Sequence, residues 1–343
     1  MQLRTFRILT ISLVILLTAT VPAGCFLHPV SHRKETVMGA ANEIIIAGKN
    51  RAERERILKE AFKILHAIDG KMSLYQSSSE IARLNAKGFA EPQQVSPETF
   101  EVIEKSAEAY RETGGAFDIT ILPLMRLWGF YGKKHGVPAE EAIQQTLLLT
   151  GTNRLRLDPQ NSKVGFSVPG MGIDLGGIAK GYACDKVVTY LKSQGIQCAL
   201  VNIGGTVYAL GLSPNGKPWR VGLRHPRDPG MVFQVLPLEN QAVATSGDYA
   251  QFFIADGKRY AHILDPQTGY PARHLVSVSV IAPSATTADI LSTALFVLGP
   301  AKVDLIANKF PGIRWYLAYL TGKDQLEMIE GPTADGSIKK TRI

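Results

Sequence analysis

Cysteine is scarce in this chain, which has three in 343 residues. The sequence contains no Cys-x-x-Cys pair and no cluster of cysteine with histidine, which excludes a disulfide framework and a zinc site of the usual spacing. Basic residues are nowhere concentrated, because the formal net charge of +8 includes no run of five basic residues. This spread-out excess predicts no nucleic-acid partner.

The composition itself, with 45% apolar and 20% charged residues, is that of a globular protein. It excludes disordered, collagen-like and coiled-coil classes. A chain of this length forms one large domain or two, and in either case it can bury a substantial core.

The N-terminus predicts export. A basic start with Arg4 and Arg7 precedes an apolar run over residues 8–21, which is shorter than the roughly 20 residues of a membrane-spanning helix. This is the pattern of a secretory signal peptide, here residues 1–24. Cys25 follows two small residues and resembles a bacterial lipoprotein processing site, although Pro22 stands where leucine is usual.

We therefore expect a membrane lipoprotein, held by lipid on Cys25 and facing the periplasm or cell exterior. Simple export with an incidental Cys25 is the alternative. Residues 25–36 resemble a polar tether, in which Pro29 separates His28 from His32 and argues against a metal pair. In an oxidising compartment Cys184 and Cys198 either pair or remain buried thiols, and the sequence leaves this open.

The order of predicted helices and strands favours an α+β fold, because no steady βαβ alternation is present. The pattern over residues 197–282 predicts mostly strands. Glycines just beyond residues 112, 193 and 298 are expected to end the helices that precede them. The helix from residue 51 is expected to stop at Gly70. Apolar spacing and turn signals predict helices over residues 51–69, 96–112, 138–149, 178–193, 287–298 and 301–309, and strands within 37–47, 153–157, 163–168, 314–319 and 326–329.

A glycine-rich turn at residues 172–181 carries Asp174 and Lys180 just before a predicted helix. Glycines let a backbone approach a phosphate closely, and the helix start offers free N–H groups. The turn matches neither a P-loop nor a dinucleotide fingerprint. An ordinary strand-to-helix turn with an exposed lysine is the alternative.

Asp289 and Thr293 lie four residues apart on a predicted helix and therefore share a face. A carboxylate and a hydroxyl suit a hard cation such as Mg²⁺. Taken alone, a helix-start aspartate and a packed threonine are the commoner roles.

Two further segments place polar groups at turns. His262 ends a predicted strand, where it can act as a general base or serve a structural role. Asp118 follows Gly115 after a helix, where it can bind a ligand or enter the next turn. By contrast, residues 126–151 show no motif residue, and we expect a surface insertion there.

Together these segments resemble the ApbE family, the FAD:protein FMN transferases. The resemblance runs from about residue 36 to residue 320 and implies an ApbE-type α+β catalytic domain over residues 37–330, followed by a tail over 331–343. The matching segments, in family order, are Val37–Gly39, Met72–Tyr75, Gly115–Asp118, Asp174–Gly181, Asn202–Gly205, His262–Gly269 and Asp289–Thr293.

The resemblance implies Mg²⁺-dependent transfer of FMN from FAD to a Thr or Ser hydroxyl of an acceptor protein, with release of AMP. The acceptors would be exported or membrane proteins of electron-transfer complexes that carry a flavinylation motif. It also implies metal ligands in Asp289, Thr293 and the carbonyl of Gly177, and places Asp289 with His262, our candidate base, in catalysis. The FAD-binding positions that it implies are Met38, Tyr75, Ala116, Phe117, Asp118, Asp174, Lys180 and Ile263.

Three alternatives remain beside this function. The same site could hydrolyse FAD to FMN and AMP. A flavin-binding lipoprotein without catalysis would not need Asp289, Thr293 and His262 together. A solute-binding protein of two α/β lobes fits poorly with the strand-rich middle of the chain.

Overall fold

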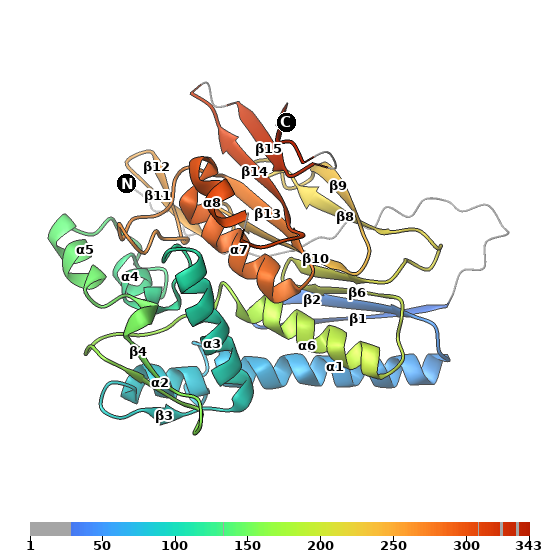
Figure 1. The fold of residues 1–343 in the computed structure, drawn as a ribbon, viewed down its shortest axis with the longest axis horizontal. Coiled ribbons are helices and arrows are strands. Elements are labelled where there is room, and N and C mark those ends of the chain that lie inside the picture. The colour runs from blue at the N-terminus through green and yellow to red at the C-terminus, as the bar shows by residue number, and fades with distance from the viewer. Residues whose placement is uncertain (1–28, 133, 308, 323–324, 334–335) are drawn as a thin grey trace.

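Nine antiparallel strands form the central sheet of the protein (Figure 1). The structure is a computed structural model and describes residues 29–132, 134–307, 309–322, 325–333 and 336–343. From one edge to the other, the strands are β1 (Val30–Val37), β2 (Ala40–Ala47), β6 (Ala199–Ile203), β7 (Thr206–Leu210), β10 (Gln241–Gly247), β13 (Ser277–Ala282), β14 (Arg314–Leu320), β15 (Leu326–Gly331) and β16 (Lys339–Arg342).

Three helices cover one face of this sheet, namely α1 (Arg51–Met72), α6 (Ala179–Ser193) and α7 (Ala285–Leu298). A two-stranded ribbon of β8 (Trp219–Arg224) and β9 (Val232–Leu238) covers the other. The alternation along β13 shows why, since Val278 and Val280 pack on the helices and Ile281 packs on the ribbon. Side chains of a strand point to opposite faces in turn, so both faces of the sheet are buried.

The remaining elements gather mainly at one end of the sheet, on the left in Figure 1. Here α3 begins with a serine cap and a proline, as the sequence predicts. The elements are α2 (Glu80–Lys87), β3 (Gln93–Gln94), α3 (Pro97–Glu112), η1 (Ile119–Ile121), α4 (Leu122–Leu127), α5 (Glu140–Leu147), η2 (Thr152–Arg154), β4 (Leu155–Asp158), β5 (Lys163–Phe166), β11 (Phe252–Ala255), β12 (Lys258–Ala261), η3 (Pro300–Lys302) and α8 (Val303–Ala307).

The α+β class is confirmed, and the predicted helices are present with small shifts at their ends. One predicted stop is wrong, because α1 continues through Gly70 to Met72 and is capped at Ser73. Left-handed glycines do end helices elsewhere, at Gly195 after α6 and at Gly299 after α7. Helix α2 was not expected from the sequence.

The expected tether is wrong over residues 30–36, which form β1 at the edge of the central sheet. Their polar side chains find partners on α1, because Arg54 donates to the Ser31 hydroxyl at 2.9 Å and His66 lies 2.8 Å from Glu35. On the other side of the strand, His32 lies 3.2 Å from Glu43. Residues 1–28, which include Cys25 and His28, lie outside the described part of the chain.

The expected C-terminal tail also contributes a strand, because Lys339–Arg342 pairs with β15 as β16. Cross-strand ion pairs join Lys340 to Glu327 at 2.6 Å and Lys339 to Glu330 at 3.6 Å. The lysines at this sheet edge are typical of strands that discourage pairing with another chain.

Two further findings concern the cysteines and the helices. Cys184 is buried and Cys198 is half-buried, and both are free thiols. Within residues 29–343, apart from the gaps named above, no helix is long and apolar enough to cross a membrane.

Candidate active site

The glycine-rich turn before α6 is organised by the Asp174 carboxylate. Its Oδ1 accepts a hydrogen bond from the N–H of Gly176 at 2.8 Å, an arrangement by which aspartate stabilises a turn. Lys180, in the first turn of α6, folds back and donates to the carbonyl of Gly176 at 2.9 Å. The turn therefore brings one carboxylate and one ammonium group to the start of α6.

Asp289 connects α7 to this turn. Its side chain is buried, and Oδ2 accepts a hydrogen bond from the N–H of Gly181 at 2.9 Å. Burial raises the pKa of Asp289, because desolvation disfavours the charged carboxylate, and the positive charge of Lys180 opposes that effect. A buried carboxylate near a single cation is well placed to bind a further cation.

Thr293 follows Asp289 by one helical turn, and its hydroxyl lies 3.5 Å from that of Ser246 on β10. Gly177 lies directly opposite, since a Cβ at this glycine would stand 3.2 Å from Thr293 Oγ1 and 3.1 Å from the Phe117 ring. Gly177, Thr293 and Phe117 therefore meet in space, as the predicted site requires. Ser246 had no recognisable signal in the sequence.

Lys180 stands between two other predicted site segments. A Cβ at Gly204 would lie 3.0 Å from Lys180 Cδ and 2.8 Å from Cβ of Ala40. Gly204 belongs to the turn after β6, where Asn202 Oδ1 accepts a hydrogen bond from the N–H of Gly205 at 2.9 Å. The absence of a side chain at Gly204 lets the lysine stem pass this turn.

Met38 lies in the two-residue turn between β1 and β2 with a left-handed backbone (φ 55°), followed by Gly39 with φ 68°. Positive φ at both positions is typical of a type I′ hairpin, but methionine rarely adopts it. The buried amide of Asn42 holds the turn by donating to the carbonyls of Val37 and Ala40, each at 3.0 Å. Strain of this kind is characteristic of ligand sites.

His262 directly follows β12, as predicted, and its imidazole is held by the backbone of Gln251. Nδ1 lies 3.1 Å from the Gln251 carbonyl oxygen, and this contact favours the tautomer in which Nδ1 donates and Nε2 is free to accept a proton. Burial lowers the pKa of His262 below 6.5, and the charge of Lys180 adds to this effect. The imidazole is therefore mainly neutral at pH 7.

The remaining predicted FAD positions differ in exposure. Ala116, Phe117 and Ile263 are buried, whereas Tyr75 is 80% exposed. Asp118 acts as a structural cap, because its Oδ1 accepts from the N–H of Thr120 at 2.8 Å and from the hydroxyl of Thr152 at 2.6 Å. This contact set favours the turn role over direct ligand binding for Asp118.

The segment expected to be a surface insertion is instead partly buried beside the site. Trp128 and Phe130 pack with Tyr260 in an aromatic cluster, and Trp128 Nε1 donates to the carbonyl of Gly269 at 2.8 Å. Next to them, the hydroxyl of Tyr131 donates to Asp174 Oδ2 at 2.7 Å. This contact could not be predicted from the sequence, because no motif was recognised in the segment.

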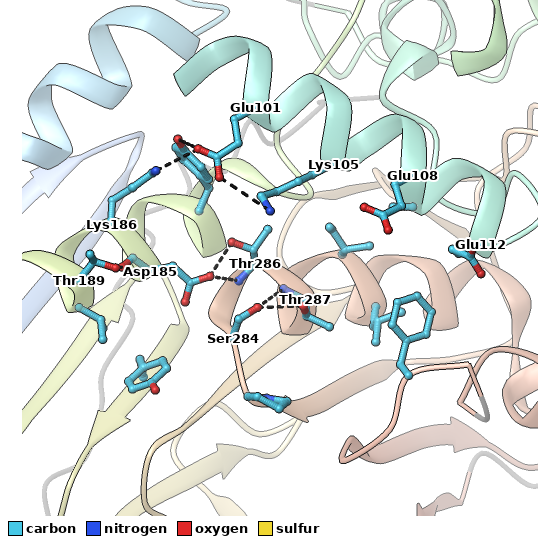
Figure 2. Close-up of a pocket in the computed structure, with 18 of the residues that line it drawn as sticks. Glu101, Lys105, Glu108, Glu112, Asp185, Lys186, Thr189, Ser284, Thr286 and Thr287 are labelled. Atoms are coloured by element: carbon cyan, nitrogen blue, oxygen red, sulfur yellow. Dashed lines mark hydrogen bonds and ion pairs between the residues drawn. The ribbon is translucent and has the colours of Figure 1, made fainter. Parts of the chain in front are cut away.

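A separate cavity of about 530 Å³ lies between α3, α6 and the start of α7 (Figure 2). None of the predicted site residues lines it. Asp185 lines it and accepts hydrogen bonds from the N–H groups of Ala285 and Thr286, both at 2.8 Å. Because this carboxylate already satisfies the first amides of α7, we assign Asp185 a structural role.

All the predicted ligand atoms at the candidate metal position are oxygens. Among the described residues, no three His, Cys, Asp or Glu side chains come together as a metal site. The predicted set has one carboxylate, one hydroxyl and one backbone carbonyl, so it does not depend on such a cluster. Mg²⁺ accepts a few protein oxygens and completes its shell with phosphate and water.

Comparison with known proteins identifies the family of this chain. A FAD:protein FMN transferase of Vibrio cholerae is 36% identical over 266 residues, which cover 76% of this chain and 79% of the relative. Another, from Treponema pallidum, is 34% identical over 297 residues and 82% of each chain. The crystal structure of the ApbE protein of Thermotoga maritima superposes with a TM-score of 0.79 at 33% identity, covering 91% of this chain and 97% of the other.

A further structural relative is the flavinyl transferase ApbE of Pseudomonas stutzeri, with a TM-score of 0.77 and 33% identity over 92% of this chain and 95% of the other. The profile of the ApbE family matches residues 38–317. This match runs from Met38 into β14 and includes every residue predicted for the site. The chain therefore belongs to the ApbE family.

Proposed function

We propose that this protein is a FAD:protein FMN transferase that moves FMN from FAD to a Thr or Ser hydroxyl of an acceptor protein and releases AMP. The observation that carries the proposal is the meeting of the glycine-rich turn with the Asp289–Thr293 face of α7. His262 is joined to this site through Gln251 and the segment of Phe130 and Tyr131, which contacts Asp174. The relatives named above support the proposal, because each of the two curated ones is a FAD:protein FMN transferase.

The donor set fits Mg²⁺. The Asp289 carboxylate, the Thr293 hydroxyl and the carbonyl of Gly177 would hold the ion, since Gly177 and Thr293 are adjacent and Asp289 is buried. Mg²⁺ bound there would supply positive charge to the pyrophosphate of FAD and to the leaving phosphate.

The chain itself contributes a base and a cation. The acceptor hydroxyl oxygen forms a bond to the phosphorus of the FMN half of FAD. The bond between this phosphorus and the bridging oxygen of the pyrophosphate breaks, and AMP leaves with the bridging oxygen. His262 Nε2 takes the proton from the hydroxyl, which a neutral imidazole can do. Lys180, whose ammonium group lies on the Gly176 carbonyl at the start of α6, would offer charge to the phosphate oxygens.

The flavin nucleotide would lie along the residues that the family resemblance implies. Met38, in its left-handed turn, and the exposed ring of Tyr75 would contact FAD at the rim. Phe117, buried beside Gly177, would bound the pocket from within. The structural contacts of Asp118 give it an indirect role, in which it shapes the turn that carries Phe117.

We also propose that the protein is an exported lipoprotein, anchored to a membrane by lipid on Cys25 and facing the periplasm or cell exterior. The signal pattern of residues 1–24 supports this. Its acceptors would then be exported or membrane proteins of electron-transfer complexes.

The test uses the full chain in detergent with FAD, Mg²⁺ and an acceptor domain that carries a flavinylation motif. We expect the intact mass of the acceptor to rise by one FMN unit, and the gain to disappear with EDTA. If the acceptor stays unmodified while FAD is cleaved to FMN and AMP, the activity of the protein is hydrolysis of FAD and not transfer of FMN. Unmodified acceptor and intact bound FAD, repeated with a second acceptor, would leave a flavin-binding protein without catalysis.

A further inference from the structure

We propose that Tyr131 is a specificity-determining residue that recognises the flavin ring of FAD. The inference rests on the proposed function and deepens it, because it assigns part of the substrate to a side chain outside the family motifs. Four observations support it: the contact of Tyr131 with Asp174, its contact with Tyr75, its rigid support and its place directly after Phe130, whose ring lies beside that of His262.

The Asp174 carboxylate accepts hydrogen bonds from two separate parts of the chain. Its Oδ1 holds the N–H of Gly176 at 2.8 Å, and its Oδ2 holds the hydroxyl of Tyr131 at 2.7 Å. One side chain therefore fixes both the turn that leads to Gly177 and the orientation of an aromatic ring. Because a hydrogen bond to a carboxylate is among the stronger ones, the Tyr131 ring is held in place before any ligand arrives.

Tyr131, which is partly buried, and Tyr75 form an aromatic corner. Their ring centroids lie 5.7 Å apart with an angle of 45° between the planes. Tyr75 is 80% exposed, so a ligand can reach its ring. Because the two planes are tilted by 45°, a planar group that stacks on the Tyr75 ring would present its edge to Tyr131, and a wide ring system would reach both residues.

The chemistry of the corner favours recognition by ring area. The Tyr131 hydroxyl already donates to Asp174, so the residue offers a ring face more readily than a hydrogen bond. Stacked and tilted aromatic contacts contribute about 0.5–1.5 kcal/mol each beyond the burial of area. The isoalloxazine ring is the largest planar group of FAD, and it is therefore the part that this corner would select.

The segment before Tyr131 is rigid and leads to the catalytic side of the site. Trp128 is fully buried, and its indole N–H donates a hydrogen bond to the carbonyl of Gly269. The centroids of the Phe130 and His262 rings lie 6.4 Å apart. Gln251 joins the two parts, since its side chain donates to the Phe130 carbonyl at 3.2 Å and its own carbonyl holds His262. The same scaffold thus positions the aromatic corner and the candidate base.

The test compares three ligands by titration calorimetry on the full chain in detergent with Mg²⁺: FAD, FMN and ADP. FAD and FMN contain the flavin ring, whereas ADP carries only the purine and phosphates. We expect Tyr131→Leu to weaken FAD and FMN binding by about tenfold and to leave ADP binding unchanged. Tyr131→Phe keeps the ring but frees Asp174, and we expect a smaller loss of about threefold.

Tyr319→Phe is the matched control, because the Tyr319 hydroxyl also donates to a carboxylate, Glu327, at 2.8 Å on the β14–β15 hairpin. It should leave all three affinities unchanged. Thermal melting of each variant would confirm that it is folded. An equal loss of ADP and FMN binding in a folded Tyr131→Leu variant, or no loss for either flavin, would overturn the inference.

The transferase assay separates this inference from the proposed function. In that assay we expect Tyr131→Phe to raise the KM for FAD while kcat stays within about twofold of the unsubstituted chain. If the unsubstituted chain transfers no FMN but still loses flavin affinity with Tyr131→Leu, the proposed function fails and the ring contact stands. If it transfers FMN and Tyr131→Leu has normal flavin affinity, only the inference fails.

Discussion

Asp289 on α7 accepts a hydrogen bond from the backbone N–H of Gly181 on α6, with 2.9 Å between Oδ2 and N. The two residues are 108 positions apart in the sequence. This contact places the proposed metal ligand against the turn that would hold the FAD phosphates. It also orients the carboxylate, so that its other oxygen remains for a cation.

Replacement of Asp289 by asparagine should abolish FMN transfer. The amide oxygen can still accept from Gly181, but the negative charge that would hold Mg²⁺ is lost, and we expect a fall of at least about 100-fold in kcat. Acceptor mass, followed over time at saturating FAD and over a range of Mg²⁺ concentrations, measures the effect.

Asp185→Asn is the control for that variant, because Asp185 makes the other carboxylate-to-amide link between α6 and α7. It should lower the free energy of unfolding by about 1–3 kcal/mol and leave the Mg²⁺ dependence of transfer unchanged. Equal transfer by the Asp289→Asn protein and the unsubstituted chain would remove Asp289 from the metal site.

The rate of transfer should follow the ionisation of His262. Burial lowers the pKa of His262 below 6.5, so the base is mainly neutral at pH 7 and kcat/KM should fall as the pH drops through this lowered pKa. Rates measured between pH 5 and pH 8 should show this acidic limb, and His262→Gln should remove it together with most of the activity. His66→Gln, on α1 beside Glu35, should keep the limb.

The same shift has a consequence for stability. Because the folded pKa of His262 lies below the unfolded value of 6.5, the unfolded chain binds more protons between these two values. The contribution of His262 to stability is therefore complete above pH 6.5 and is lost as the pH falls through that window. Denaturant unfolding at pH 7.5 and pH 5.5 should show a smaller difference in the His262→Gln variant.

Gly177→Ala should impair metal binding more than folding. The added Cβ would stand 3.1 Å from the Phe117 ring and 3.2 Å from Thr293 Oγ1, so one neighbour must move. We expect the Mg²⁺ concentration for half-maximal transfer to rise about tenfold. Gly70→Ala is the control, since its Cβ would meet nothing within 4 Å in α1, and it should stabilise the protein by about 0.5–1 kcal/mol.

Met38→Asn should change stability and FAD binding in opposite directions. The turn has φ 55° at Met38 and φ 68° at Gly39, and Asn-Gly is the preferred pair for this hairpin. We expect a gain of about 1 kcal/mol in the free energy of unfolding and a higher KM for FAD. A stabilised variant with unchanged KM would show that Met38 does not contact FAD.

Much of the local structure could be predicted from the sequence, because local signals decide it. The start of α3 is predicted by a serine cap followed by proline, and left-handed glycines mark the ends of α6 and α7. The glycine-rich turn with Asp174 and Lys180 was recognisable as a motif. Each of these features depends on contacts between residues close in the chain.

The predictions of secondary structure are wrong where contacts with residues distant in the sequence decide the conformation. Residues 30–36 are polar and resemble a tether, yet α1 provides Arg54 and His66 for Ser31 and Glu35, and the segment becomes a strand. Gly70 resembles a helix stop, but α1 continues to Met72 because its apolar face stays packed beyond the glycine. Tertiary contacts override local propensity in both cases.

The amino-acid sequence by itself determined the α+β class, the positions of most helices and the membership of the ApbE family. Only the tertiary structure decided which polar groups meet. Tyr131 reaches Asp174 across 43 residues and Gly181 reaches Asp289 across 108. Such contacts depend on sheet order and helix packing, which arise from burial of the whole core and leave no periodic signal in any one segment.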